Sequence, residues 1–287
     1  MKQTRTPDNY AVFGNPIAHS KSPRIHTLFG AQTGEAVEYG AICAEPEEFA
    51  QDVMLFLVAG GKGCNITVPF KQEAWELADE LSDYAARAKA VNTLAFRDDG
   101  TMVGHNTDGI GIVRDLQQNH GIALQGKRIL LLGAGGAVRG VLQPLLEAQP
   151  ASLFIANRTA AKALELAHDF AEFGQISGGG FADISGQFDL IINGTAASLQ
   201  GELPPLPDGC LASGGCTYDM MYSAKPTAFV EWGRAQGAAQ ALDGLGMLVE
   251  QAAEAFFIWR GVRPDTAPVL TQLREEFQSL RGYNPMT

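Results

Sequence analysis

A glycine-rich turn stands in the middle of the chain, directly after an apolar run and at the start of an expected helix. The turn covers Gly133–Ala137, and the apolar run before it is Arg128–Leu132. Glycines in such a turn let the backbone approach a pyrophosphate, and the helix N-terminus adds free N–H groups and a positive dipole end. The match to GxGxxG is imperfect, because Val138 stands where that pattern has its third glycine. The turn predicts a dinucleotide site, and an ordinary strand-to-helix turn is the alternative.

A second group of polar residues follows the next expected strand. It is Asn157-Arg158-Thr159, and it begins 24 residues after Gly133. Folds that bind NAD place an Asp or Glu near this position to hold the ribose 2′-hydroxyl, and this chain has no acid there. The guanidinium of Arg158 is suited to a 2′-phosphate, to which Thr159 and Lys162 add a hydrogen bond and a charge. The segment therefore predicts NADP rather than NAD, with a solvated surface arginine as the alternative.

Two charged residues are candidates for proton transfer. Lys71 ends the segment Asn65–Lys71 and stands at an expected helix start, where the helix dipole disfavours a cation. Asp108 lies in the segment Asn106–Gly109. An exposed lysine and a first-turn helix acid are the alternatives that local sequence leaves open. His105 precedes this segment, but residues so close along the chain rarely face each other, so we expect no His–Asp pair.

A third polar segment, His19–Pro23, carries two serines at an expected helix start. Hydroxyl groups beside free backbone N–H groups suit a carboxylate or a polyol. A simple helix cap at Ser22 is the alternative. Neither serine lies in a GxSxG pattern, so a nucleophilic serine is not expected.

Strand-like and helical segments alternate along the chain, which predicts an α/β fold with mostly parallel sheets. Because the glycine turn falls in mid-chain, we expect a Rossmann-like nucleotide-binding domain at 109–244. Residues 1–108 form a separate α/β domain, on which the helical segment 245–287 packs. Asp98-Asp99-Gly100 predicts a hairpin, and the glycine run Gly178–Gly180 is interpreted as a turn.

Composition narrows the class of protein. The chain has 287 residues with 21 basic and 32 acidic side chains, which gives a net charge of −11. That balance argues against general binding to nucleic acid or to anionic membranes. We find neither a signal-peptide pattern nor an apolar run of about 18 residues. The four cysteines form no CxxC and have no ligand spacing, so we expect a cytoplasmic protein with reduced thiols and no metal.

Taken together, these segments resemble the shikimate dehydrogenases, NADP-dependent enzymes of aromatic amino-acid biosynthesis. The resemblance runs in order from residue 10 to about residue 265. The stretches that carry it are Val12–Pro16, His19–Pro23, Asn65–Lys71, Ala90–Thr93, Asn106–Gly109, Gly133–Arg139, Asn157–Thr159, Tyr218–Tyr222 and Asp243–Gln251.

The resemblance implies a role for each matched position and reduction of 3-dehydroshikimate to shikimate as the reaction. Lys71 and Asp108 resemble the catalytic pair, although the sequence does not decide which is the formal acid. The implied substrate contacts are Ser20 and Ser22 to the carboxylate, Thr67, Asn92 and Gln251 to ring hydroxyls, and Asn65 and Tyr222 nearby. The implied NADP contacts are Gly133, Gly135, Gly136, Ala137, Asn157, Arg158, Thr159 and Lys162, with Met220 and Gly244 at the nicotinamide end. We expect a monomer or a homodimer.

Two departures from the family pattern and three competing interpretations remain. Gly194–Ser198 lacks hydroxyls that many relatives carry beside the cofactor, and His105 stands where relatives often have Asp. The first competitor is a quinate/shikimate dehydrogenase that uses NAD, which Arg158 disfavours. The second is a methylenetetrahydrofolate dehydrogenase-like enzyme, which the Ser20/Ser22 pair and the Asn106–Gly109 segment disfavour. The third is a non-catalytic ligand sensor, which the presence of both Lys71 and Asp108 disfavours.

Overall fold

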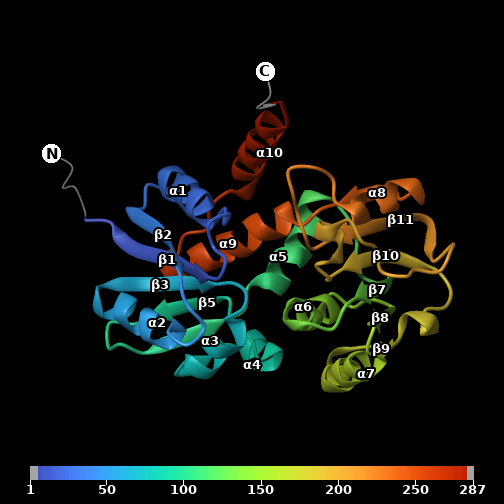
Figure 1. Cartoon of the computed structure of the whole chain (residues 1–287), viewed down its shortest axis with the longest axis horizontal. Helices are drawn as coiled ribbons and strands as arrows, with labels where there is room; N and C mark the ends of the chain where they lie inside the picture. Colours follow the sequence, from blue (N-terminus) through green and yellow to red (C-terminus); the bar gives the residue numbers. More distant parts are fainter. Residues whose placement is uncertain (1–5, 283–287) are drawn as a thin grey trace. The chain divides into compact units, whose positions relative to one another are not determined.

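The chain folds into two compact units, each built on one six-stranded sheet (Figure 1). The computed structural model describes residues 6–282. Unit 1 extends to Gly111 and takes up again over Val249–Val269. Unit 2 is Ile112–Leu248 with the chain from Leu270.

The sheet of unit 1 is mixed. Its order is β2-β1-β3-β5-β6-β4, with β1 parallel to β2 and β3, and β5 antiparallel to β3 and β6. The expected hairpin at Asp98–Gly100 is confirmed, because β5 and β6 pair across it. The strands are β1 (Asp8–Gly14), β2 (Val37–Cys43), β3 (Gly61–Ile66), β4 (Glu80–Leu81), β5 (Thr93–Phe96) and β6 (Met102–His105).

Helices cover both faces of this sheet. On one face Phe49 of α2 stacks on Phe70 beside α3, with ring centroids 4.6 Å apart, and both belong to one apolar cluster with Phe13. On the other face Tyr10 and Tyr39 pack with Trp259 of α9. The helices are α1 (Ser22–Thr33), α2 (Phe49–Val58), α3 (Lys71–Leu77), α4 (Asp83–Ala88), α5 (Asp108–Arg114) and α9 (Leu245–Arg260).

The first helix differs slightly from the expectation at its start. It begins at Ser22 itself, and the capping position is Lys21, whose side chain makes no cap hydrogen bond. Gly34 ends it in the left-handed conformation at φ +74°, as the sequence predicts.

The sheet of unit 2 is parallel throughout, in the order β12-β11-β10-β7-β8-β9. Numbered from β7, this is the 3-2-1-4-5-6 order of doubly wound dinucleotide-binding folds. The expected Rossmann-like unit in the second half of the chain is therefore confirmed. The strands are β7 (Arg128–Leu132), β8 (Ser152–Ala156), β9 (Ile176–Gly179), β10 (Phe188–Asn193), β11 (Leu211–Asp219) and β12 (Gln240–Leu242).

Strand β9 corrects part of one interpretation, because Gly178 and Gly179 of the expected turn belong to the strand, and only Gly180 lies beyond it, before the helical turn that begins at Phe181. A Cβ on Gly178 would lie 2.3 Å from the carbonyl oxygen of Ala163 in α7. Helix α7 lies so close to this strand that no side chain fits there. Glycine is required here by close packing between a helix and a strand. The sequence pattern alone does not distinguish such a glycine from one in a turn.

The last helix packs within unit 2 from Leu270 onward, whereas the sequence boundaries grouped 245–287 with the first domain. Its Phe277 stacks on Tyr222, and its Arg274 donates to Asp243. Among the described residues no helix is long and apolar enough to cross a bilayer. The remaining helices are α6 (Gly136–Glu147), α7 (Ala160–Asp169), α8 (Ala228–Ala235) and α10 (Thr266–Gly282), with the short helical turns η1 (Asp115–Asn119), η2 (Ala171–Phe173), η3 (Phe181–Asp183) and η4 (Ala197–Gln200).

Candidate functional site

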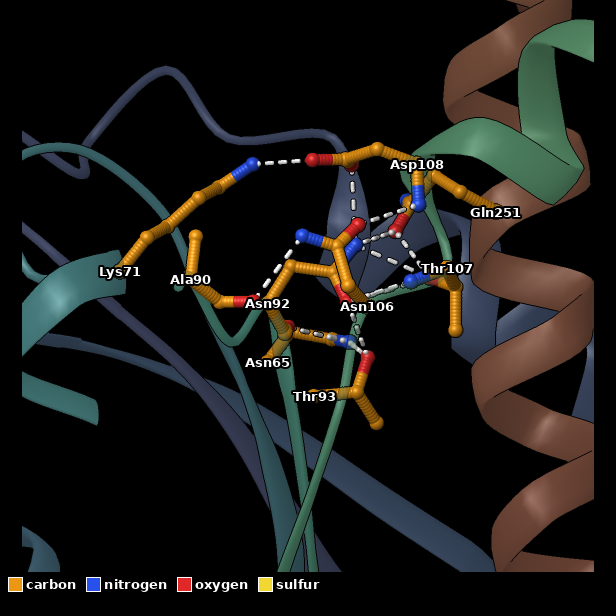
Figure 2. A network of polar contacts seen from close by, with 9 residues as sticks. All are labelled: Asn65, Lys71, Ala90, Asn92, Thr93, Asn106, Thr107, Asp108 and Gln251. Carbon is orange, nitrogen blue, oxygen red and sulfur yellow. Dashed lines mark hydrogen bonds and ion pairs between the residues drawn. The ribbon is translucent and has the colours of Figure 1, made fainter. Parts of the chain in front are cut away.

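Lys71 and Asp108 form a close ion pair in unit 1 (Figure 2). Lys71 Nζ lies 2.6 Å from Asp108 Oδ2, and the side chains are only 22% and 10% exposed. Each residue is the first of its helix, α3 and α5. The carboxylate offsets the unfavourable position of a cation at a helix N-terminus, and the partial burial strengthens the pair relative to a surface one.

Asn92 orients the carboxylate of this pair. It is 3% exposed and lies just before β5. Its Nδ2 donates to Asp108 Oδ1 and to Thr107 Oγ1, both at 2.9 Å, and its Oδ1 accepts from the Thr107 backbone N–H at 2.9 Å. Asp108 is thus held by Lys71 on one oxygen and by Asn92 on the other, so its carboxylate has little freedom to rotate.

The segment before α5 supplies further support from residues to which the sequence assigned no role. Asn106 Nδ2 donates to the Ala90 carbonyl at 3.0 Å, and its Oδ1 accepts from the Asp108 N–H at 3.1 Å. The Thr107 hydroxyl donates to Gln251 Oε1 at 3.3 Å. An Asn two residues before a helix start is a sequence signal for such a bond, since its side chain bonds the backbone two residues on.

Of the other predicted substrate contacts of unit 1, Asn65 bonds to the network around Asn92. Asn65 is buried, and its Nδ2 donates to the Asn92 carbonyl at 3.2 Å and to Thr93 Oγ1 at 3.0 Å. Thr67 is half-buried just after β3. Ser20 Oγ accepts from the Ser22 N–H at 3.3 Å, and Ser22 is buried. Within residues 6–282, no hydrogen bond joins Ser20 or Thr67 directly to Lys71 or Asp108.

The glycine turn of unit 2 is an open cradle. Gly133 has φ +105°, which glycine adopts without strain, and its N–H donates to the Ala156 carbonyl at 2.8 Å. A Cβ on Gly135 or Gly136 would meet nothing within 4 Å. Helix α6 starts here without a side-chain cap, so its first N–H groups can donate to a ligand. The residues present, with Ala137 in the first turn of α6, fit a pyrophosphate.

The segment after β8 presents its polar groups to solvent. Arg158, Thr159 and Lys162 are exposed, and Asn157 Nδ2 donates to the Thr159 carbonyl at 3.0 Å. Arg158 makes no ion pair or hydrogen bond within residues 6–282. Its guanidinium is therefore available for a phosphate, which fits NADP.

Tight packing shapes the segment after β11. A Cβ on Gly244 would lie 2.2 Å from the Met220 carbonyl, so only glycine fits there. Asp219, to which the sequence assigned no role, is buried and accepts from Thr227 Oγ1 at 2.6 Å and Asn193 Nδ2 at 3.0 Å. Burial raises its pKa against the opposing effect of these hydrogen bonds. Asp219 fixes the chain on either side of Met220.

The two departures from the family pattern have structural counterparts. Ala197 begins the turn η4, and Thr195 Oγ1 donates back to Asn193 Oδ1 at 2.8 Å. His105 ends β6, and its carbonyl accepts from the Asn92 N–H at 3.0 Å. Burial lowers the pKa of His105. His105 thus contacts Asn92 through its backbone carbonyl.

Three domain families match successive parts of the chain. Residues 12–94 match the family described as shikimate dehydrogenase substrate binding domain. Residues 115–200 match shikimate / quinate 5-dehydrogenase, and residues 244–274 match shikimate 5′-dehydrogenase C-terminal domain. The matches cover both units and include Lys71, the glycine turn and Gln251.

Whole proteins and solved structures agree with these matches. The chain is 58% identical over 281 residues to the shikimate dehydrogenase (NADP(+)) of Nitrosococcus oceani, which covers 98% of this chain and 100% of that one. A crystal structure of an Ael1 enzyme from Pseudomonas putida superposes with TM-score 0.88 at 49% identity, over 93% of this chain and 98% of that one. Shikimate 5-dehydrogenase from Thermus thermophilus, in complex with NADP(H) and shikimate, superposes with TM-score 0.84 at 31% identity, over 93% and 99%.

Proposed function

The chain belongs to the shikimate dehydrogenase family, and we infer that it catalyses the reversible NADPH-dependent reduction of 3-dehydroshikimate to shikimate. The observation that carries this function is 58% identity over nearly the full length to a relative named for it. The reaction lies in the shikimate pathway, which leads to chorismate and the aromatic amino acids.

We propose that Lys71 and Asp108 perform the proton chemistry of this reaction. The bound cofactor supplies the hydride that adds to the ring ketone carbon. Negative charge then develops on the ketone oxygen, and the Lys71 ammonium stabilises it and donates a proton from Nζ. In the oxidative direction Lys71 takes up the hydroxyl proton. Asp108 keeps Nζ in place through their 2.6 Å contact and serves as the counter-charge.

The remaining polar residues of unit 1 are proposed to bind the substrate. Ser20 and Ser22 donate to its carboxylate, supported by their position at the start of α1, where the Ser20 side chain lies beside the Ser22 backbone N–H. Thr67, Asn92 and Gln251 bind the ring hydroxyls. Asn92 and Gln251 are supported by their hydrogen bonds in the network around Asp108. Asn65 and Tyr222 are proposed to lie near the substrate.

Unit 2 is proposed to bind NADP through backbone groups at one end and exposed cations at the other. Gly133, Gly135, Gly136 and Ala137 take the pyrophosphate, supported by the open space above the two exposed glycines. Asn157, Arg158, Thr159 and Lys162 take the adenosine 2′-phosphate. Met220 and Gly244 are proposed to lie at the nicotinamide end.

Location and assembly remain proposals. We propose a cytoplasmic protein, supported by four cysteines that are all free, one of them exposed. We propose a monomer or a homodimer, which analytical ultracentrifugation of the purified chain decides.

The function is tested by initial rates of nicotinamide reduction with shikimate and with quinate, each paired with NADP and with NAD. We expect rapid turnover with shikimate and NADP, and rates lower by at least about tenfold with NAD, since one lost charge-assisted contact has that effect. Quinate should also turn over more slowly, because its additional hydroxyl has no proposed partner. Faster turnover of quinate with NAD contradicts the proposal and identifies the catabolic type. Shikimate binding without any turnover identifies a sensor.

A further inference from the structure

A buried tyrosine of unit 1 lies at the far end of the hydrogen bonds that reach Asp108. Tyr39 is on β2 and is 9% exposed. Its hydroxyl donates to Asn65 Oδ1 at 2.6 Å. Neither the family resemblance nor the proposed mechanism gives this tyrosine a role, although its hydrogen bond is among the shortest in the buried part of the unit.

From Asn65 the hydrogen bonds continue in one direction. Asn65 Nδ2 donates to Thr93 Oγ1 at 3.0 Å, Thr93 Oγ1 donates to Asn92 Oδ1 at 3.0 Å, and Asn92 Nδ2 donates to Asp108 Oδ1 at 2.9 Å. Figure 2 shows the part of this series from Asn65 to Asp108. At every step the donor is on the Tyr39 side and the acceptor is on the Asp108 side. Hydrogen bonds aligned in this way polarise and strengthen one another, so the series favours one fixed orientation of the carboxylate at its end.

Two features keep Tyr39 in the donor role. Burial raises the pKa of Tyr39 well above its ordinary value, against the opposing effect of a hydrogen bond with the Ser22 side chain, so the phenol keeps its proton. The neighbouring His26 is fully buried, and its ring stacks on the ring of Tyr39 with centroids 4.3 Å apart and an interplanar angle of 3°. Burial lowers the pKa of His26 to about 3, so the stacked imidazole is neutral at working pH. The phenol ring is thus held in place without competing charge.

We propose that Tyr39 is a positioning residue of the reaction, which acts through Asn65, Thr93 and Asn92 to hold the Asp108 carboxylate against Lys71. The proposal rests on the proposed function, because it assigns Asp108 its place in the proton chemistry. Tyr39 and Thr93 act through other residues and not by touching the reacting atoms. Their removal is therefore expected to slow the chemical step more than it weakens substrate binding.

The variant Tyr39→Phe tests this directly, because it removes the hydroxyl and keeps the ring that stacks on His26. We expect kcat to fall about tenfold, the effect of one hydrogen bond, while the KM for NADP stays unchanged. The KM for shikimate should rise by a smaller factor than kcat falls, because Ser22 and Asn65, which contact the Tyr39 hydroxyl, are proposed to bind the substrate. The matched control is Tyr10→Phe. Tyr10 is the register partner of Tyr39 on β1, is also buried, and accepts from Arg260 at 3.3 Å, outside the series. The control is expected to keep the wild-type kcat.

Thr93 provides a second test that does not depend on the folding of the Tyr39 variant. Thr93→Val removes the hydroxyl at nearly constant volume, and Thr93→Ser retains it. We expect Thr93→Val to lose kcat as Tyr39→Phe does, and Thr93→Ser to restore most of it. Since both changes interrupt one series, the double variant Tyr39→Phe/Thr93→Val is expected to be no slower than the slower single variant.

Three results would overturn the proposal: wild-type kcat in Tyr39→Phe, an equal loss in Tyr10→Phe, or losses that multiply in the double variant. The wild-type rate with shikimate and NADP tests the proposed function. The ratio of variant to wild-type kcat, measured on whichever polyol the wild type oxidises, tests Tyr39. The two failures are therefore distinguishable.

Discussion

The two ends of the proposed chemistry are built in opposite ways. Around Asp108, buried side chains form hydrogen bonds with one another. The single side chain of Asn92 donates to Thr107, Asp108 and Gln251. At the glycine turn, Gly135 and Gly136 are exposed with empty space above them. After the neighbouring strand β8, Arg158 makes no ion pair or hydrogen bond to another described residue.

The two regions are therefore expected to control different properties, the proton chemistry in unit 1 and the choice of cofactor in unit 2. In unit 1 the donors and acceptors are oriented by hydrogen bonds among themselves, as electrostatic stabilisation of a developing charge requires. In unit 2 the backbone is proposed to form the cradle for the cofactor, and single exposed side chains such as Arg158 are proposed to select between NADP and NAD. Changes around Asp108 are therefore expected to interact, whereas changes at the cofactor segment are expected to act separately.

The largest effect is expected from Lys71→Ala. Without the ammonium nothing stabilises or protonates the developing oxyanion, so kcat should fall by about 10³-fold, with the KM for shikimate changed less than about threefold. Steady-state rates at saturating NADP measure this. The control is Lys62→Ala. Lys62 also pairs with an aspartate, Asp98, at 3.2 Å, but the two side chains are 45% and 98% exposed, so its loss should leave kcat unchanged. A large KM change with normal kcat in Lys71→Ala would assign Lys71 to binding alone.

Arg158→Ala should affect the cofactor and leave the chemistry intact. Loss of a charge-assisted contact to the 2′-phosphate is expected to raise the KM for NADP about 30-fold, while kcat at saturation stays near wild type. NAD lacks that phosphate, so its KM provides the internal control and should change little. If the KM values for both cofactors rise together, Arg158 does not read the phosphate.

His26→Phe should remove a pH dependence of stability that the wild type owes to the burial of the His26 imidazole. The pKa of His26 is about 3 when folded and about 6.5 when unfolded, so the unfolded chain binds the extra proton between these values. The stability contribution is therefore complete above pH 6.5 and is lost as the pH falls toward 3. Between pH 7 and pH 5 the wild type should lose about 2 kcal/mol of unfolding free energy more than the variant. Urea denaturation at the two pH values measures the difference, and equal losses would contradict it.

Gly136→Ala should give the smallest effect and the cleanest separation of binding from folding. The added methyl meets no protein atom within 4 Å, so thermal stability should stay at the wild-type level. If the pyrophosphate binds at this turn as proposed, the methyl stands in its way, and the KM for NADP should rise about tenfold, the effect of one lost hydrogen bond. Gly133→Ala is the matched contrast, since its φ of +105° and Thr195 at 3.1 Å should make it unstable. An unstable Gly136→Ala would show that the cradle is structural.

Local sequence predicted the elements and the glycine turn better than it predicted the substrate site. The parallel sheet of unit 2 follows from alternating strands and helices, and the turn follows from its place after β7. The meeting of Lys71 and Asp108, 37 residues apart, is a tertiary contact that no local spacing encodes, and only the family resemblance suggested it. Gly178 was misinterpreted because close packing and a turn both select glycine. Tyr39 passed unnoticed because a buried tyrosine in a strand is ordinary until its partner is known.

The most direct test of the account is a double-mutant cycle on the pair at its centre. Single-turnover hydride transfer is measured by stopped flow for wild type, Lys71→Ala, Asp108→Asn and the double variant, all saturated with substrate and cofactor. If the two residues act as one unit, the double variant should be no more than about threefold slower than Lys71→Ala alone. Losses that multiply across the cycle would show two independent groups and contradict the account.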